Sequence, residues 1–419
     1  MHDEVLVDIE LRGENAHVGT LHREPRRGYE AVGFEYAESW LERSDSFSLE
    51  PALRLAPGTY SPASNQALFG ALGDSAPDTW GRQLMRRAER LAARDQGRRV
   101  RTLFELDYLL GVADVARTGA LRFRRSASGE YLAATAHGVP SVIHLRELYE
   151  ATDRVVRDEA SAEDLRLILA PGSSLGGARP KASITSADGT LAIAKFPKDT
   201  DEYSLERWEM IALTLAKNAG INAAAAKLVS VAGRPVITIQ RFDRIRDHRI
   251  PFLSAMSMLE QRDGATSSYP EIVDALARHG SSGGADAREL YRRMAFNVLI
   301  SNVDDHLRNH AFLWSGADGW QLSPAYDLNP TPVDVRERRL TTNITLDDST
   351  CDLDLVLEAA EYFGLGAGDA KSILREIASA VRDWRSVANE YNATRSEAER
   401  MSSAFEHDDL RRALTLSGA

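Results

Sequence analysis

The feature that most constrains this chain is an aspartate, an asparagine five positions later, and a second aspartate beyond a predicted hairpin. These residues are Asp304, Asn309 and Asp327. Two short apolar runs, 311–314 and 320–322, lie between them, and the segment joining the runs contains two glycines, which predicts a β-hairpin. Such a hairpin would fold Asp327 back beside Asn309, so we expect the chain to be organised around this site.

These residue types in this order suit phosphoryl transfer. A carboxylate such as Asp304 can orient an attacking hydroxyl, while an amide oxygen from Asn309 and a carboxylate from Asp327 can hold Mg²⁺ ions that bridge the phosphates. Magnesium prefers hard oxygen ligands and keeps several waters, so two side chains plus phosphate oxygens suffice. Taken alone, the Asp-x-x-x-x-Asn pattern also fits a helix C-terminus with solvated acids, so support must come from the rest of the chain.

Composition sets the outer limits. A chain of 419 residues can bury one large core or two to three ordinary ones, and 43% hydrophobic with 27% charged residues is typical of a soluble globular protein. No window approaches the roughly 20 apolar residues of a membrane helix, and the acidic start does not resemble a secretory signal. Cys351 is the only cysteine, which excludes a disulfide framework or a thiolate metal cluster and leads us to expect a cytoplasmic protein. The net charge of −11 argues against a surface that binds nucleic acid throughout.

The N-terminal part predicts a small sheet followed by a basic helix. Residues 1 to about 60 alternate short apolar runs with Gly and Pro, as strands of an antiparallel sheet do. Residues 69–81 are dense in turn formers and lead into a helical segment rich in arginine, with Arg82, Arg86, Arg87, Arg90, Arg94, Arg98, Arg99 and Arg101. This segment is either a patch for phosphate backbones or acidic partners, or a solvated helix face.

A glycine-rich segment follows two predicted helices, 145–151 and 162–169. It contains Ser174, Leu175, Gly176, Gly177 and Ala178, and it ends at Lys181. Glycines and small residues let backbone N–H groups approach a phosphate without interference from a Cβ atom. The segment matches neither the Walker A loop nor G-x-G-x-x-G, so a flexible connector is the alternative interpretation.

Lys195 is a candidate for binding phosphates. Asp188-Gly189 predicts a tight turn between strands 182–185 and 190–196, and Leu191, Ile193 and Lys195 share one face of the second strand. A strand lysine after a glycine-rich turn is where a kinase keeps its phosphate-binding lysine. The alternative is an edge-strand lysine that points to water.

The helix predicted from about Ser204 to Asn218 carries a possible partner for Lys195. Its apolar stripe includes Glu209, whereas Glu206 is free to tilt toward solvent. A carboxylate on a packing face needs a partner because an unpaired buried charge is costly. We therefore expect an ion pair between Lys195 and Glu209, in the manner of protein kinases.

Two more predicted strands, 227–231 and 236–240, run into Arg241, where β character ends. We place the hinge between two lobes here and expect adenine against the backbone from Gln240 to Phe242. Beyond this point the pattern is mainly helical, with a flexible loop at 280–284 and a helix from Ala287 to about Ser301.

Competing site chemistries have little support. His306 and His310 are four positions apart, but Leu307 stands where H-E-x-x-H needs its glutamate. The chain also lacks a Rossmann fingerprint followed by its acidic residue.

With these residues in view, the chain resembles the HipA family of bacterial toxin–antitoxin kinases over nearly its whole length. The matching segments are 69–81 with its S-x-P-D-x-W-G core, 111–114, 119–123, 173–181, 194–197, 241–244, 302–309 and 326–327. The resemblance implies an α+β fold of the bilobal protein-kinase type. A HipA-type N-terminal subdomain (1–125) would precede a kinase domain (126–419). That domain would have a β-rich, nucleotide-binding part (126–240) and an all-helical C-lobe (241–419).

The resemblance also implies roles for single residues in an ATP- and Mg²⁺-dependent serine/threonine kinase. Asp304 would be the catalytic base, Asn309 and Asp327 would bind Mg²⁺, and Lys195 would bind the phosphates. His306 and Lys181 would line the nucleotide site. Ser174 matches the serine that family members autophosphorylate, and its phosphate would repel those of ATP. Ser173 beside it leaves the phosphorylated residue uncertain by one position, and Gln240 stands where the founding toxin has a glutamate.

Partners and targets follow from the same resemblance. It implies a small helix-turn-helix antitoxin of the HipB type, with the complex binding operator DNA mainly through the antitoxin. The founding toxin phosphorylates glutamyl-tRNA synthetase, so an aminoacyl-tRNA synthetase is one candidate substrate. Two other hypotheses stay open: a non-catalytic, nucleotide-binding co-repressor that acts with such an antitoxin, and a small-molecule kinase.

Overall fold

The chain forms two compact units. The computed structural model describes residues 3–26, 28–64, 66–133, 139–169, 177–316 and 319–417. Unit 1 comprises Met1–Lys198, Ser230–Arg234 and Thr238–Arg262, and unit 2 comprises Asp199–Val229, Pro235–Ile237 and Asp263–Ala419. The chain therefore passes between the units several times before it stays in unit 2.

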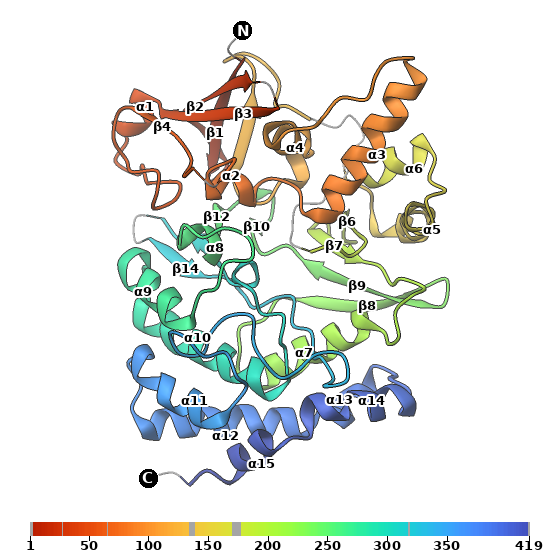
Figure 1. Cartoon of the computed structure of the whole chain (residues 1–419), viewed down its shortest axis with the longest axis vertical. Coiled ribbons are helices and arrows are strands. Elements are labelled where there is room, and N and C mark those ends of the chain that lie inside the picture. Colours follow the sequence, from red (N-terminus) through yellow and green to blue (C-terminus); the bar gives the residue numbers. More distant parts are fainter. Residues whose placement is uncertain are drawn as a thin grey trace. The chain divides into compact units, whose positions relative to one another are not determined.

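Unit 1 begins with an antiparallel sheet in the order β4-β3-β2-β1-β5 (Figure 1). Its strands are β1 (Asp3–Leu11), β2 (Glu14–Arg26), β3 (Tyr29–Tyr36), β4 (Thr59–Tyr60) and β5 (Leu121–Arg124). Val5, Val7 and Ile9 of β1 are buried, as expected for one face of a strand. The predicted small antiparallel sheet is confirmed, and β5 joins it from residues outside the first 60.

Helices form the rest of the N-terminal part of unit 1. These are α1 (Glu38–Leu41), α2 (Gly70–Asp74), α3 (Thr79–Asp95) and α4 (Glu105–Gly111), with short 3₁₀ turns η1 (Asp114–Ala116) and η2 (Val142–His144). The basic helix α3 begins where Asp78 accepts a hydrogen bond from the amide of Gly81 at 2.8 Å. Arg98, Arg99 and Arg101 of the predicted basic segment lie beyond its end.

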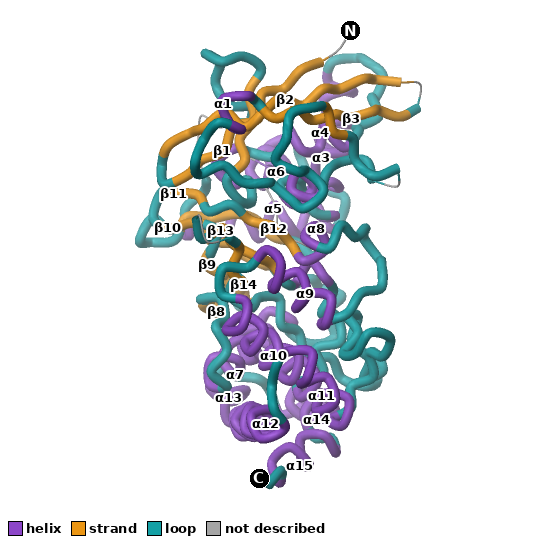
Figure 2. Tube along the Cα trace, turned by 90° about the vertical axis from the view of Figure 1, so that its left-hand side faces the viewer, coloured by secondary structure: helices purple, strands orange, loops and turns teal. Residues whose placement is uncertain are grey.

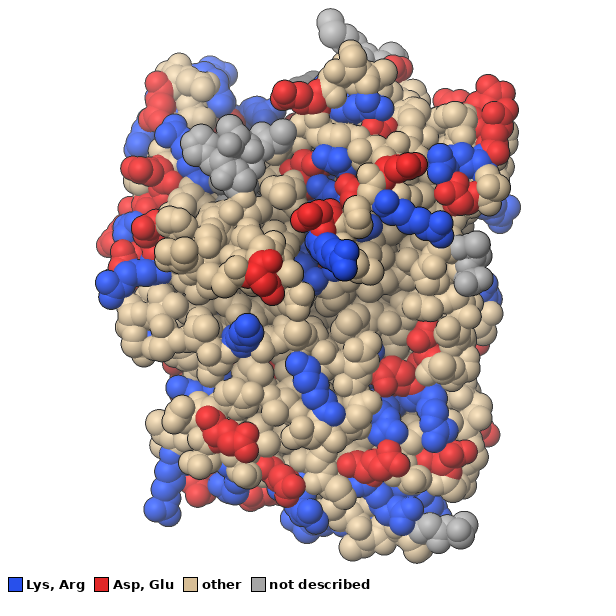
Figure 3. All heavy atoms as spheres, turned by 180° about the vertical axis from the view of Figure 1, so that it is seen from behind, with Lys and Arg blue, Asp and Glu red and all other residues tan. Residues whose placement is uncertain are grey.

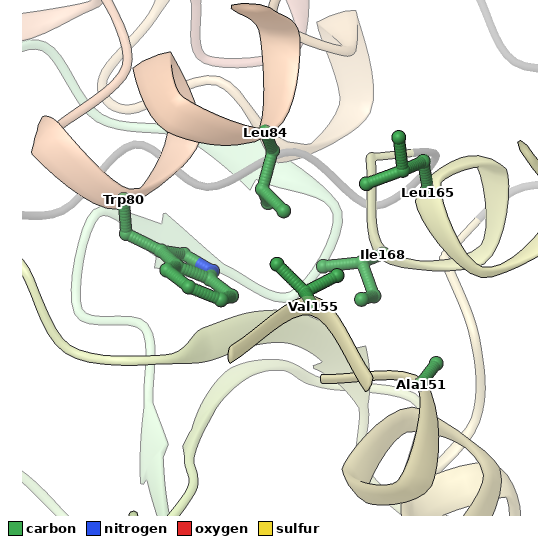
Figure 4. Packing of buried hydrophobic residues seen from close by; sticks show 6 residues of the cluster. All are labelled: Trp80, Leu84, Ala151, Val155, Leu165 and Ile168. Atoms are coloured by element: carbon green, nitrogen blue, oxygen red, sulfur yellow. The ribbon is translucent and has the colours of Figure 1, made fainter. Parts of the chain in front are cut away.

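Helix α3 packs on α5 (Leu145–Val156) and α6 (Ala162–Leu169) through one apolar cluster. Figure 4 shows this cluster, which consists of Trp80, Leu84, Ala151, Val155, Leu165 and Ile168. All six side chains are buried, with Leu84, Ala151 and Ile168 fully so. The cluster thus holds the first turn of α3 against the two helices that precede the glycine-rich segment.

A second sheet in unit 1 carries strands in the order β6-β7-β9-β8. They are β6 (Lys181–Thr185), β7 (Leu191–Lys195), β8 (Ala226–Val231) and β9 (Arg234–Gln240), and parts of β8 and β9 are counted with unit 2. The predicted turn at Asp188-Gly189 is present, with φ of +84° at Gly189. Three short strands, β10 (Arg244–Ile245), β11 (His248–Arg249) and β12 (Phe252–Ser254), and helix α8 (Ala255–Met258) complete the unit.

Unit 2 is mostly helical, as the colouring of Figure 2 shows. Its helices are α7 (Leu205–Asn218), α9 (Tyr269–His279), α10 (Gly283–Leu299), α11 (Leu353–Ala359), α12 (Ala367–Arg382), α13 (Trp384–Glu390), α14 (Arg395–Phe405) and α15 (Asp408–Thr415), with η3 (Leu307–Asn309) and η4 (Ala360–Phe363). Because α10 begins at Gly283, the loop expected at 280–284 is shorter than predicted. Trp384 and Phe405 stack in the core with ring centroids 4.7 Å apart, and the ring of Trp208 packs at a tilt against both.

The predicted hairpin of unit 2 is confirmed. β13 (Ala311–Trp314) pairs antiparallel with β14 (Trp320–Leu322), and an irregular segment runs from there to α11. The helices at Ser204–Asn218 and 145–151 are also where the sequence predicts them, although α5 extends to Val156. Within the described part of the chain, no helix combines the length and apolar character that crossing a membrane requires.

Candidate functional site

Helix α10 of unit 2 delivers the chain into the loop that carries Asp304. The loop is fixed to the end of the helix by Asn302. Its backbone amide donates to the carbonyl of Asn297 at 2.9 Å, and its side-chain amide donates to Oδ1 of Asn297 at 3.0 Å. Ser301 has a φ of +52°, a left-handed backbone conformation that residues other than glycine rarely adopt. The turn that precedes Asp304 is therefore strained and held in place by buried amides.

Asp304 itself is exposed. Its side chain is 64% exposed, and its Oδ1 lies 3.3 Å from a guanidinium nitrogen of Arg336. An exposed ion pair of this length is weak, so it leaves the carboxylate able to accept a proton from another group.

Asn309 is buried and oriented by the same loop. Its Nδ2 donates to the carbonyl oxygen of Asp304 at 3.0 Å. Because that bond uses the nitrogen end of the amide, the orientation of Oδ1 is set at the same time. An amide oxygen held in this way is a suitable hard ligand for Mg²⁺.

The structure brings the segment of Asp327 to this loop. Tyr326, one residue before Asp327, donates its hydroxyl to the carbonyl of Arg308. The backbone amide of Asn329 donates to Oδ1 of Asn302 at 3.1 Å, and its side chain donates to Oδ1 of Asp327 at the same distance.

Asp327 has a φ of +56°, which is unusual for an aspartate inside a folded chain. Asn302, Asn329 and Asp327 thus form a hydrogen-bonded series that leads from the loop of Asp304 to the second acid. Sequence reasoning assigned no role to Asn302 or Asn329, since no spacing rule marks the residues that orient a site.

Asp305 is buried beneath the loop, next to the exposed Asp304. Its carboxylate accepts hydrogen bonds from the hydroxyl of Tyr269 at 2.7 Å and from the amides of Thr341 and Thr342 at 2.9 and 3.3 Å. Burial nevertheless raises the pKa of Asp305 to about 7. Asp305 therefore ties the loop to the segment at 341–342, a role that the sequence did not predict.

The two histidines of the loop differ in their surroundings. His306 is half-buried, whereas His310 is fully enclosed and packs edge-on against Tyr269, with ring centroids 5.2 Å apart. Burial lowers the pKa of His310 to about 3, so the ring is neutral at physiological pH. His310 is thus a packing residue in this structure.

In unit 1, Lys181 occupies a buried position at the start of β6. Its Nζ donates to Oδ2 of Asp78 at 2.8 Å, and its carbonyl accepts from the indole nitrogen of Trp80 at 3.0 Å. Gly177, at a φ of +108°, is so close that an added Cβ atom would lie 3.3 Å from this Nζ. Ser174, Leu175 and Gly176 lie outside the described residues, while Ala178 is described and exposed.

Lys195 ends β7, directly opposite Lys181 in the antiparallel register. Opposed residues of such a pair project from the same face of the sheet, and like charges placed there repel each other. In this structure the ammonium group of Lys181 is paired with the carboxylate of Asp78, which offsets its charge. The sequence identified both lysines but did not predict that they are cross-strand partners.

Glu209 lies buried on α7 of unit 2. Glu206, for which the helix period also allowed an orientation toward solvent, is equally buried, so the first turn of α7 is enclosed on both sides. The expected ion pair between Lys195 and Glu209 stays a prediction.

The segment expected at the adenine is anchored firmly within unit 1. Arg241 donates to Oδ1 of Asp243 at 2.6 Å and to the carbonyl of Ala116 at 2.9 Å, while Asp243 accepts from the amide of Gly119 at 2.8 Å. Burial alone would raise the pKa of Asp243, but Arg241 and Arg244 hold it well below its usual range. Two of the segments that carry the family resemblance, 119–123 and 241–244, are therefore physically joined.

The side chains on either side of Arg241 are more accessible. Gln240 is exposed and Phe242 is half-buried, with its ring 6.5 Å from that of Phe252. The backbone between them is fixed by the bond from the amide of Arg241 to the carbonyl of Leu191 at 2.9 Å.

Many arginines of the basic segment are paired with acids. Arg82 bonds Glu105 at 2.5 and 2.7 Å, and Arg98 bonds Glu89 at 2.6 and 3.0 Å. Figure 3 shows one face of the molecule, on which basic and acidic side chains are interspersed. The pairing favours a solvated helix face for this part of the segment, although Arg86 and Arg90 are exposed and have no acid within 4 Å among the described residues.

An α+β chain that carries two opposed lysines on a hairpin, and an Asp–Asn–Asp site in a mostly helical part, has the organisation of a protein-kinase-like fold. Comparison with a solved structure agrees. A chain from the Shewanella oneidensis MR-1 complex of HipA, HipB and operator DNA matches with a TM-score of 0.65 at 18% identity, covering 97% of this chain and 96% of that one.

Sequence comparisons give the family. The model described as the HipA-like C-terminal domain matches residues 173–385, which is 213 of 419 residues, and the HipA N-terminal domain model matches residues 9–104. Accordingly, the chain belongs to the HipA family, which confirms the resemblance and the predicted α+β, protein-kinase-like fold. The prediction that residues 241–419 are all helical is wrong, because the short strands β10 to β14 lie in this range.

Two curated relatives illustrate the match. The Sinorhizobium fredii protein named "Putative kinase Y4mE" is 27% identical over 330 residues, which cover 72% of each chain. The serine/threonine-protein kinase toxin HipA of Shewanella oneidensis is 25% identical over 187 residues, which is 38% of this chain and 43% of that protein.

Proposed function

We propose that this protein is an ATP-dependent serine/threonine protein kinase of the HipA toxin type. The observation that carries the proposal is the arrangement in unit 2, where hydrogen bonds from Asn302 and Asn329 connect the loop of Asp304 and Asn309 to Asp327. An exposed carboxylate, an oriented amide oxygen and a second carboxylate are the groups that phosphoryl transfer requires. Two relatives are named as kinases, which supports the same activity.

Each group has a distinct task. Asp304 accepts the proton of the attacking hydroxyl, because it is the exposed acid of the loop. Asn309 and Asp327 hold Mg²⁺, which neutralises charge on the phosphates when bound. His306 lies between Asp304 and Asn309 and lines the nucleotide site.

The phosphates are bound from unit 1. Lys181 and Lys195 are opposed on one face of the hairpin, so a polyphosphate offers charge that both ammonium groups can share. Backbone amides of the glycine-rich segment, from Ser174, Leu175 and Gly176 to Gly177 and Ala178, complete the cradle. The adenine contacts the backbone between Gln240 and Phe242.

Regulation and partners belong to the same proposal. Phosphate on Ser174 would add about two negative charges to the cradle and switch the enzyme off by repelling ATP. The solved relative was crystallised with HipB and operator DNA. We therefore propose a helix-turn-helix antitoxin as the partner here, with DNA contacted mainly through it, and a cytosolic protein such as an aminoacyl-tRNA synthetase as the substrate.

The test is phosphate transfer by an Asp304→Ala variant. With radiolabelled ATP, the wild type should label itself and a protein of the host lysate, and the variant should label neither while still binding ATP. Asp274→Ala, which removes an exposed acid on α9, is the matched control and should transfer normally. Phosphopeptide mass spectrometry of the same samples assigns the modified serine to position 173 or 174. Full transfer by Asp304→Ala would refute the assignment of the base.

A nucleotide-binding co-repressor without catalysis is the second candidate. Arg86 and Arg90 favour it, because they lie one turn apart on the exposed face of α3 and could contact phosphate backbones. This function predicts salt-sensitive operator binding with the antitoxin, weakened by replacing both arginines with Ala, and no phosphate transfer to any protein.

A further inference from the structure

We propose that Asp78 and Trp80 of the N-terminal part form a clamp on Lys181, and that this clamp positions the lysine for the phosphates of ATP. The inference rests on the proposed kinase function, because it assumes that Lys181 contacts the nucleotide. According to this proposal, the S-x-P-D-x-W-G segment contributes directly to the affinity for ATP. This segment lies far from the kinase residues in the sequence. In this reading Asp78 is a positioning residue and not a catalytic one.

The carboxylate of Asp78 is held by a second hydrogen bond besides the one to the lysine. One oxygen accepts the amide of Gly81 at 2.8 Å and so caps the first turn of α3. The other oxygen accepts Nζ of Lys181 at 2.8 Å, across 103 residues of sequence. The two side chains are 2% and 3% exposed, so the ion pair is almost fully removed from water.

Trp80 holds the same lysine at its backbone. The indole nitrogen donates to the carbonyl of Lys181 at 3.0 Å. The ring itself lies in the cluster of Figure 4, where it packs beside Leu84 and Val155. Because that cluster is buried on every side, the indole N–H cannot follow a displaced strand, and the start of β6 is held in one place.

The ammonium group and the backbone carbonyl of Lys181 are therefore held by two residues, Asp78 and Trp80, at the start of α3. An ammonium group has three N–H donors, so a bond to Asp78 is compatible with donation to a phosphate. The fixed carboxylate sets the direction in which the ammonium group of Lys181 points. Gly177 shows how close the glycine-rich segment comes, since a Cβ there would lie 3.3 Å from Nζ.

A positioning role makes a specific prediction about affinity. Without the carboxylate, the lysine becomes a flexible, buried charge that must be ordered each time ATP binds. The dissociation constant for MgATP should therefore rise, while the rate of phosphate transfer at saturating ATP, which depends on unit 2, should change little. A purely structural role for Asp78 would instead lower stability and leave the affinity of the folded fraction unchanged.

The experiment measures MgATP binding by isothermal titration calorimetry and KM and kcat by phosphate transfer, on the full chain. We expect Asp78→Asn to raise the dissociation constant and KM for ATP roughly tenfold, and Trp80→Phe, which keeps an aromatic side chain but removes the indole N–H, roughly threefold, with kcat within about twofold. The matched control is Asp107→Asn. Asp107 also accepts a hydrogen bond from a backbone amide at a helix start, that of Phe104, but it pairs with Arg23 rather than Lys181. Its replacement should therefore leave ATP affinity unchanged.

A double-mutant cycle with Lys181→Met adds the decisive comparison. If Asp78 acts through the lysine, Asp78→Asn should have no further effect on ATP affinity once Lys181 is gone. Equal affinity in wild type and Asp78→Asn, or fully additive losses in the double variant, would overturn the clamp while leaving the kinase function intact. Should Asp78→Asn not fold, Trp80→Phe decides, and unchanged affinity in that variant overturns the proposal. A wild-type chain that binds no MgATP would instead overturn the proposed function, and the clamp with it.

Discussion

Asp305→Asn is expected to remove a pH dependence of stability from the wild-type chain. Asp305 is fully buried and accepts the hydroxyl of Tyr269 and the amides of Thr341 and Thr342. Burial raises its pKa from the ordinary 3.8 to about 7. Asparagine has nearly the same shape but cannot ionise, so the substitution separates titration from packing.

The sign of the effect follows from linkage. A carboxyl whose pKa is higher in the folded than in the unfolded chain binds its proton more tightly when folded. Its contribution to stability is fully present below pH 4 and is lost as the pH rises to about 7. One pH unit between the two pKa values corresponds to 1.36 kcal/mol, so the loss amounts to about 4 kcal/mol at most.

Urea unfolding between pH 4 and pH 8 measures this difference. The free energy of unfolding of wild type minus that of Asp305→Asn should fall by several kcal/mol over this range. Taking the difference cancels the other titrating groups, since the two chains share them. Asp274→Asn, on the exposed face of α9, should give a profile parallel to that of the wild type.

A flat difference between wild type and Asp305→Asn would refute the reasoning. It would mean that the bonds from Tyr269, Thr341 and Thr342 stabilise the carboxylate enough to offset its burial. A difference that rises with pH would have the same meaning more strongly, because the pKa of Asp305 would then be lowered by folding.

Two further predictions concern the networks around the proposed site. Asp243→Ala should lower the melting temperature and cost about 3–5 kcal/mol, because it leaves Arg241 and Arg244 buried without their acid; an unchanged melting curve would contradict this. Asn329→Ala removes the side-chain bond to Asp327, so phosphate transfer should fall roughly tenfold and need more Mg²⁺, as a magnesium titration would show; an unchanged Mg²⁺ dependence would count against Asp327 as a ligand.

Local signals explain why much of the fold could be predicted from the sequence. Helix α7 was located to within a residue, because Ser204 caps it and the apolar stripe fixes its period. The turn at Asp188-Gly189 and the hairpin at 311–322 likewise depend only on residues close in sequence. Asp304, Asn309 and Asp327 could be selected for the same reason, since their types and order are visible in the chain.

What could not be predicted depends on contacts between distant segments. The bond between Asp78 and Lys181 spans 103 residues, and no spacing rule links the two. The burial of Asp305 beside the exposed Asp304 is also invisible in the sequence, where the two acids are identical neighbours. The burial of Glu206 could not be decided either, because a helix period gives the centre of the buried stripe but not how far neighbouring segments enclose the helix.

The division of the chain into interleaved units has a consequence for synthesis on the ribosome. Unit 1 draws its last segment from Thr238–Arg262, including the acid that accepts the amide of Gly119. At about 5–20 residues per second, the nascent chain therefore waits several seconds after its first sheet has emerged before that unit can close. During this interval Glu10 and Asp114, which pair with Arg249 of the last segment in the folded unit, are without that partner.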